Sequence, residues 1–99
     1  MNVFGYETFT TFYNDFSIAD RFGLSAIQDT YNRAFSEWKS DYRYLTELVL
    51  VLNWKIWEHY DKENEDYARL YDRLWRTAGE YALDNLHGEE LEYYLRTTD

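Results

Sequence analysis

Residues 42–60 read YRYLTELVLVLNWKIWEHY, and this stretch decides the fold class. Leu45, Leu48, Leu52 and Ile56 recur at the three- and four-residue spacing of one helical face. A helix that is apolar on every side is typical of a buried, central position. We therefore expect residues 42–60 to form the middle helix of a bundle. Further apolar side chains fill its remaining faces: Leu50, Val51, Trp54 and Trp57.

Helical patterns continue on both sides of this segment, and turn or capping residues separate them. Gly23 is expected to close a turn. Gly79 lies within a predicted helix, where glycine costs about 1 kcal/mol relative to Ala, so it either admits a close helix contact or marks a break. The chain thus predicts an all-α fold, a compact antiparallel bundle of three to four helices plus a short C-terminal helix, in a single domain over residues 1–99. The predicted elements are an extended arm (1–6), a helix capped by Thr8 (7–16), a short helix or continuation capped by Ser17 (17–22), a helix capped by Ser25 (25–39), the central helix capped by Ser40 or Asp41 (42–60), a helix over 65–86 and a terminal helix over 89–96.

The amino-acid composition excludes several classes of function. The 99 residues are 45% hydrophobic and 21% aromatic, which suffices for one core, and they include no cysteine for a disulfide, a thiolate metal site or a cysteine nucleophile. No apolar run approaches the ~20 residues of a membrane span, and the N-terminus lacks a signal-peptide pattern. We therefore expect a cytoplasmic, soluble protein with no membrane partner.

The formal net charge of −9 argues against direct binding of nucleic acid, because Lys and Arg supply most of that affinity. The same charge permits a basic protein partner. It is equally explained by solubility alone.

Residue patterns for catalysis or metal binding are weak. His59 offers only Glu63 at helical metal-ligand spacing, and His87 has Asp84 three residues earlier, so both are expected to be exposed helix-end histidines. The serines fit caps or exposed surface, and the nucleophile-elbow and phosphate-binding glycine patterns are absent. The sequence therefore predicts neither an enzyme nor a metal or cofactor site.

Two acidic stretches are the most informative surface feature. Glu58–Asp66 holds five acids and one lysine, and Glu80–Glu92 holds five acids with no Lys or Arg. Glu80 and Asp84 form a like-charge i, i+4 pair, which slightly destabilises the helix. A cost without a structural reason indicates that the surface has a use. Carboxylates at that spacing lie about 5–6 Å apart, a scale compatible with a phosphate backbone. The predicted partner-binding residues are Glu80, Asp84, Glu89, Glu90, Glu92 and Tyr93, with Glu58, Asp61, Glu63, Glu65 and Asp66.

Two segments carry a resemblance, FTTFYNDFSIAD over residues 9–20 and NWKIWEHY over residues 53–60. These segments resemble small uncharacterised acidic proteins of integrative and conjugative elements or phages of Gram-positive bacteria. The resemblance extends over nearly the whole chain. The resemblance brings no catalytic motif. It implies a mobile-element context, in which short acidic proteins are similar in size and charge to anti-restriction and anti-CRISPR inhibitors, several of which mimic nucleic acid.

The leading hypothesis is a non-enzymatic acidic binding protein that presents its acids to a basic protein surface, such as the groove of a host defence nuclease, as a nucleic-acid mimic. The alternative is a helical interaction or adaptor module of a mobile element that binds through an exposed aromatic patch, with self-association into a homodimer as one form. Salt separates the two, because electrostatic mimicry weakens steeply with ionic strength. An enzyme is the least favoured hypothesis.

Overall fold

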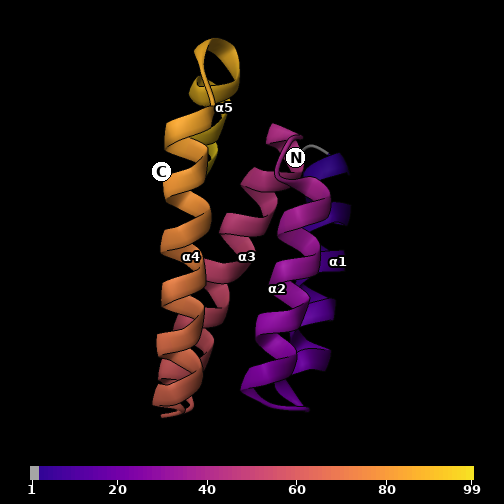
Figure 1. The fold of residues 1–99 in the computed structure, drawn as a ribbon, viewed down its shortest axis with the longest axis vertical. Helices are drawn as coiled ribbons and strands as arrows, with labels where there is room; N and C mark the ends of the chain where they lie inside the picture. The colour runs from indigo at the N-terminus through magenta and orange to yellow at the C-terminus, as the bar shows by residue number, and fades with distance from the viewer. Residues whose placement is uncertain (1–2) are drawn as a thin grey trace.

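Five helices make up the chain in a computed structural model that describes residues 3–99, with side chains from residue 5 onward. No strand occurs among these residues, so the all-α prediction is confirmed (Figure 1). None of the described helices combines the length and the hydrophobicity that a bilayer crossing needs. The helices are α1 (Val3–Asp20), α2 (Leu24–Trp38), α3 (Tyr42–Asp61), α4 (Glu65–Asn85) and α5 (Gly88–Thr98).

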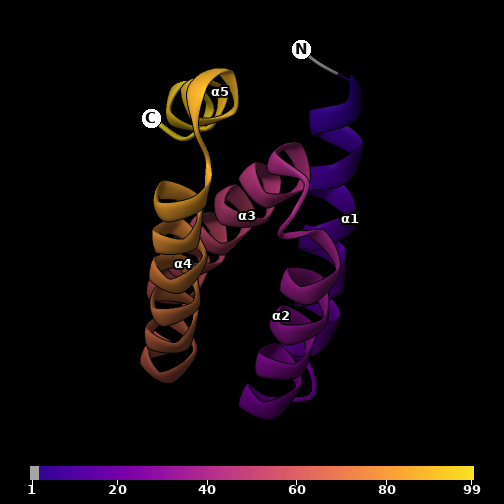
Figure 2. The same cartoon turned by 45° about the horizontal axis from the view of Figure 1, so that its top comes forward.

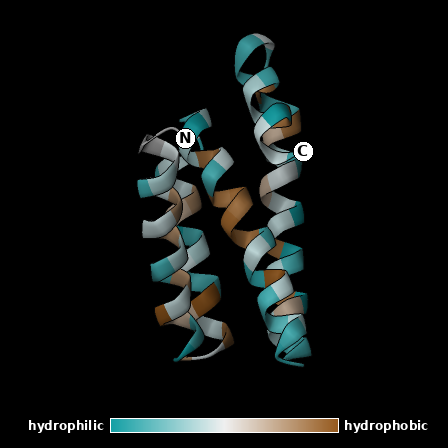
Figure 3. Ribbon diagram, turned by 180° about the vertical axis from the view of Figure 1, so that it is seen from behind, coloured by the Kyte–Doolittle hydropathy of each residue, from teal (hydrophilic) through white to brown (hydrophobic). Residues whose placement is uncertain are grey.

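Helix α3 is the centre of the bundle, as its sequence predicts. It lies between the α1–α2 pair and α4, and α5 packs across the end of α4 (Figures 1 and 2). It contacts all four other helices and has its most extensive interface with α4. Figure 3 shows the most hydrophobic ribbon along α3, between outer helices of mainly polar or neutral colour. Fully buried side chains of α3 include Leu45, Leu48, Val51 and Leu52.

The N-terminal helix differs from the prediction. Residues 3–6 belong to α1 and not to an extended arm, while residues 1 and 2 lie outside the described range. Thr8 and Ser17 are interior residues of α1 and not N-caps. The chain stays helical to Asp20 because Phe12, Phe16 and Ala19 bury one continuous face. Residues 17–20 thus continue the first helix, which is one of the two predicted alternatives, and residues 21–22 form the turn after it.

The turns follow local rules only in part. Gly23 has φ 113° and donates its N–H to the Ala19 carbonyl, so it closes the α1–α2 turn as expected. Helix α2 starts at Leu24, directly after Gly23, and Ser25 is therefore inside the helix and not its cap. Asp41 does cap α3, because its side chain accepts a hydrogen bond of 3.0 Å from the Arg43 backbone N–H.

A glycine lies within α4 in the C-terminal part of the chain. The helix runs unbroken through Gly79, so no break occurs there. A Cβ at this position would lie 3.5 Å from the Tyr94 hydroxyl of α5. This is ordinary van der Waals contact, so α5 packs against this face of α4 but the contact does not require a glycine. Gly88, with φ 60°, opens α5 after the extended residues that follow α4.

Candidate functional site

A group of four charged or titratable residues lies inside the bundle where α1 meets α3. We call Asp20, Lys55, Glu58 and His59 the buried ionic cluster. Lys55 is completely buried, and its Nζ lies 2.6 Å from Asp20 Oδ2 and 2.5 Å from Glu58 Oε2. The same Nζ donates a hydrogen bond of 3.3 Å to Ser17 Oγ. Helical spacing explains the position of Lys55, because it lies seven residues after the buried Leu48 on the same face of α3.

Tyrosines complete the hydrogen bonding around the buried ionic cluster. Tyr71 of α4 is fully buried, and its hydroxyl donates to Asp20 Oδ1 at 2.5 Å. Tyr13 of α1 donates its hydroxyl to Glu58 Oε1, and its ring lies 4.9 Å from the Lys55 Nζ. Three helices therefore contribute to one network, and each of the two partly buried carboxylates has both a cationic partner and a hydroxyl donor. This is the arrangement in which buried charge is tolerated.

The network shifts the pKa values of several of its members. Burial alone would lower the pKa of Lys55, but its bonds to Asp20 and Glu58 outweigh burial and raise it. Burial alone would raise the pKa of Glu58, but the bonds from Lys55 and Tyr13 outweigh it and lower the value. Burial and the bond to Asp20 both raise the pKa of Tyr71. Lys55 and Glu58 are therefore charged and Tyr71 is protonated at neutral pH, which suits a structural network better than proton transfer.

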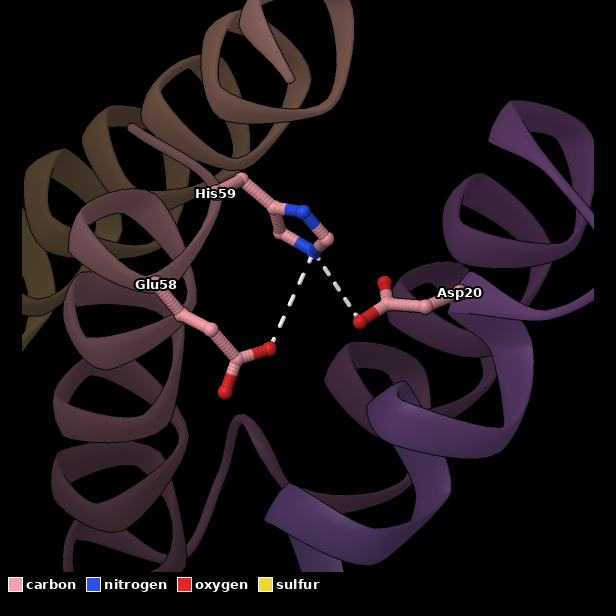
Figure 4. A group of neighbouring side chains, drawn as sticks. All are labelled: Asp20, Glu58 and His59. Atoms are coloured by element: carbon pink, nitrogen blue, oxygen red, sulfur yellow. Dashed lines mark hydrogen bonds and ion pairs between the residues drawn. The ribbon is translucent and has the colours of Figure 1, made fainter. Parts of the chain in front are cut away.

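Metal binding is the other chemistry that this cluster suggests. One ligand atom each from Asp20, Glu58 and His59 lies within 4.8 Å of the others (Figure 4). The cluster already contains a cation, however, because the Lys55 ammonium contacts the same Asp20 Oδ2 and Glu58 Oε2 atoms that would bind the ion. A metal would have to displace that ammonium into a fully buried position without its partners. The geometry therefore fits an internal ion-pair network better than a metal centre.

His59 corrects a prediction. It is not an exposed helix-end residue but is 3% exposed, and its Nε2 lies 3.0 Å from Asp20 Oδ2. Its ring stacks on Tyr71 with centroids 5.4 Å apart. His87, in contrast, is exposed as predicted. The sequence offered one signal for this cluster: Lys55 and His59 continue the spacing of the buried Leu48 and Leu52, so both belong to the inward face of α3.

The predicted acidic residues do not form one surface. The first acidic stretch, Glu58–Asp66, surrounds the α3–α4 turn, and the second, Glu80–Glu92, surrounds the α4–α5 turn at the other end of α4 (Figure 1). Glu65 and Glu80 are separated by about 22 Å of helix. Glu58 is also withdrawn from solvent by its bonds to Lys55 and Tyr13. Within the two stretches, the exposed acids are Asp61, Glu63, Glu65, Asp66, Glu80, Asp84, Glu89, Glu90 and Glu92.

Structural roles explain part of this acidity. Glu65 and Asp66 lie in the first turn of α4, and Glu89 and Glu90 lie in the first turn of α5. Negative charge at a helix N-terminus is stabilised by the helix dipole. Asp66 also pairs with Arg69 at 2.8 Å. Glu92 lies 3.8 Å from Arg96 in α5. Tyr93 is half-buried and packs edge-on against Tyr42, so it contributes to the fold as well as to the surface.

Exposed aromatic side chains form a surface whose residues the sequence did not identify. Trp54 and Trp57 were expected to help bury α3 but are 61% and 62% exposed. Tyr60 of α3 is 47% exposed, and Tyr6 of α1 is 62% exposed. We call these four residues the aromatic strip. Trp54 packs edge-on against Phe9 of α1 at 6.0 Å, and Trp57 lies 6.0 Å from Tyr60. The three α3 residues are spaced three apart and are therefore neighbours on the helix surface. Tyr6 lines the same groove as Trp54.

Comparison with known proteins does not assign the chain to a group. It matches no protein-family model, no curated protein and no solved structure. The resemblance drawn from residues 9–20 and 53–60 therefore stays a prediction. The sites described above rest on the geometry of this chain alone.

Proposed function

We propose that this chain is a non-enzymatic, cytoplasmic binding protein whose aromatic strip docks on an apolar protein surface edged with Lys and Arg. The observation that carries the proposal is the exposure of Trp54, Trp57 and Tyr60 along one face of α3. Large contiguous apolar surface is uncommon on monomeric proteins, and Trp and Tyr are enriched among residues that dominate binding energy.

Charge argues for the basic character of the partner. The net charge is −9, and Glu7 and Asp61 are exposed acids adjacent in sequence to Tyr6 and Tyr60 at the ends of the strip. Electrostatic complementarity with a basic partner speeds encounter, while the aromatic contact supplies affinity. The buried ionic cluster supports a non-enzymatic role, because its charged groups are bonded to one another and its Lys55 and His59 are buried.

The test uses two designed amphipathic peptides, one of Leu and Lys and one of Leu and Glu, titrated into the protein and followed by calorimetry. The Leu–Lys peptide is expected to bind and to retain most of its affinity at 0.5 M salt, where charges are screened beyond about 4 Å. Trp57→Ala is expected to weaken binding at least tenfold. Equal binding of both peptides would contradict a basic partner.

The matched control is Leu83→Ala, which removes a side chain that is 54% exposed on α4 and outside the aromatic strip. Its affinity is expected to equal that of the unaltered chain. If Leu83→Ala weakens binding as much as Trp57→Ala, the strip is not the contact surface. Size-exclusion chromatography covers one further outcome, since a dimer that Trp57→Ala converts to a monomer would make a second copy the occupant.

A second candidate function is nucleic-acid mimicry at the second acidic stretch, with inhibition of a basic defence nuclease as its concrete form. It is favoured by Glu80, Asp84, Glu89 and Glu90, which are exposed and make no ion pair within the described part of the chain. Reversal of these four charges should then abolish binding of a basic nuclease and leave helicity unchanged. Binding that survives 0.5 M salt would exclude this mode.

A further inference from the structure

A groove opens beside the aromatic strip where three helices converge. Its volume is about 460 Å³, within the range of small-molecule sites. Helix α3 forms its floor, and α1 and α5 form its walls. The lining residues are Gly5, Tyr6, Phe9, Glu47, Leu50, Trp54, Tyr93 and Thr97.

The floor of the groove carries a carboxylate without a partner. Glu47 is 5% exposed, and it makes no hydrogen bond or ion pair with any residue that the structure describes. Helix α1 comes close to it at a glycine, since a Cβ on Gly5 would lie 3.5 Å from Glu47 Oε2. Burial raises the pKa of Glu47 to about 7. A carboxylate with so little exposure and no partner costs free energy of folding, and a ligand that supplies a partner would recover part of that cost.

Aromatic rings surround this carboxylate. Tyr6 and Phe9 come from α1, Trp54 from α3 and Tyr93 from α5. Phe9 and Trp54 meet edge to face, with their planes 79° apart, so two ring surfaces of different orientation border the same space. The faces of aromatic rings attract organic cations, and a carboxylate among such rings adds a hydrogen-bond acceptor and a counter-charge.

We propose that this groove binds an alkylammonium group. The Glu47 carboxylate accepts hydrogen bonds from the ammonium, and Trp54, Phe9 and Tyr6 pack against the charged end and the alkyl chain. The group has two sources, a lysine side chain of a protein partner or a free monoamine. Only the first source rests on the proposed function, because there the groove anchors a basic residue of the surface that the aromatic strip contacts.

The test is a titration of the full chain with n-butylammonium, followed by ¹H–¹⁵N NMR at pH 8, above the pKa of Glu47. Tyr6 and Tyr93 are the other titratable residues that line the groove. Saturable shifts are expected for the Trp54 indole N–H and for the backbone amides of Gly5 and Thr97. Butan-1-ol, a neutral molecule of the same shape, is expected to bind at least tenfold more weakly.

Two variants that each remove one charge make the result specific. Glu47→Gln keeps the size of the side chain and is expected to weaken butylammonium binding at least tenfold. Glu80→Gln removes a charge on the exposed surface of α4 and is expected to leave it unchanged. Equal binding of butan-1-ol and butylammonium, or full affinity in Glu47→Gln, would overturn the proposal.

A third comparison identifies the source of the ammonium group. A short peptide with one central lysine is titrated beside the same peptide with acetyl-lysine. Tighter binding of the lysine peptide than of butylammonium supports a protein side chain, and weaker binding supports a free monoamine. The proposed function is tested separately by Trp57→Ala, because Trp57 is not among the groove residues. Failure of the groove and failure of the strip are therefore distinguishable.

Discussion

The Nζ of Lys55 in α3 lies 2.6 Å from Oδ2 of Asp20, the last residue of α1. An acid at the C-terminal end of a helix is opposed by the helix dipole, so this position of Asp20 needs compensation. Lys55, His59 and Tyr71 supply it from α3 and α4. The pair joins the first helix to the central one through charge and not only through apolar contact.

Loss of the lysine is expected to be costly. Lys55→Met keeps an unbranched side chain, one heavy atom shorter, but leaves the carboxylates of Asp20 and Glu58 without their buried cation. Breaking a buried pair by removing one partner costs about 3–5 kcal/mol. Urea unfolding at pH 7 measures the change. Lys62→Met is the matched control, since Lys62 is 64% exposed and lies 3.7 Å from Glu58, and its effect is expected to stay below about 1 kcal/mol.

Tyr71 of α4 stabilises the charged carboxylate of Asp20 through a hydrogen bond. Tyr71→Phe removes the hydroxyl that donates to Asp20 Oδ1 and is expected to lower the free energy of unfolding by about 1.5–3 kcal/mol, because a bond to a charged group is lost. Tyr67→Phe is the control, as that hydroxyl donates at 3.3 Å to the neutral Asp20 carbonyl. A smaller loss is expected there. Equal losses would contradict a special role for the bond to the carboxylate.

Glu47 should make stability depend on pH near neutrality. Its pKa of about 7 in the folded chain is above its ordinary value of 4.5, so the folded state holds the proton more tightly. Stability is therefore greatest below pH 4.5 for this group and is lost as the pH rises through 7, by about 3 kcal/mol in all. Glu47→Gln should remove that loss. Chemical unfolding at pH 5 and pH 8 checks it, and parallel pH profiles for both proteins would contradict the assignment.

Gly79 offers a stabilising substitution. It lies inside α4, where an added methyl group would make an ordinary van der Waals contact with the Tyr94 hydroxyl at 3.5 Å. Gly79→Ala is expected to raise the free energy of unfolding by about 0.5–1 kcal/mol, the difference in helix propensity. Gly88→Ala is the contrast, because its φ of 60° is unfavourable for a side chain, and it is expected to lower stability. A loss of stability in Gly79→Ala would show that the α4–α5 contact tolerates no added atom.

The sequence predicts the helices well because their signals are local. The apolar spacing of Leu45, Leu48 and Leu52 and the cap at Asp41 both act within a few residues. Local signals also mislead, as Ser17 and Ser25 show, since each fits a capping pattern but lies within a helix. A cap is decided by where the buried face ends, which depends on the neighbouring helices.

The site residues could not be placed in the same way. Asp20 and His59 are 39 residues apart and meet only through the packing of α1 on α3. Periodicity does assign Lys55 and His59 to the inward face, but it does not reveal their partners. The exposure of Glu47 and Trp54 could not be predicted either, because it depends on where α1 and α5 lie across α3. The sequence predicts partner-binding residues in both acidic stretches, but it does not show that α4 holds the two stretches apart.

The central position of α3 has a consequence for the order in which the chain becomes stable during synthesis. Helices α1 and α2 leave the ribosome first, yet the lysine that neutralises Asp20 and the face of α3 on which α1 packs belong to later residues. The nascent α1–α2 hairpin therefore exposes aromatic side chains and an unpaired acid until α3 emerges. Folding is expected to be completed late in translation, with no stable N-terminal intermediate.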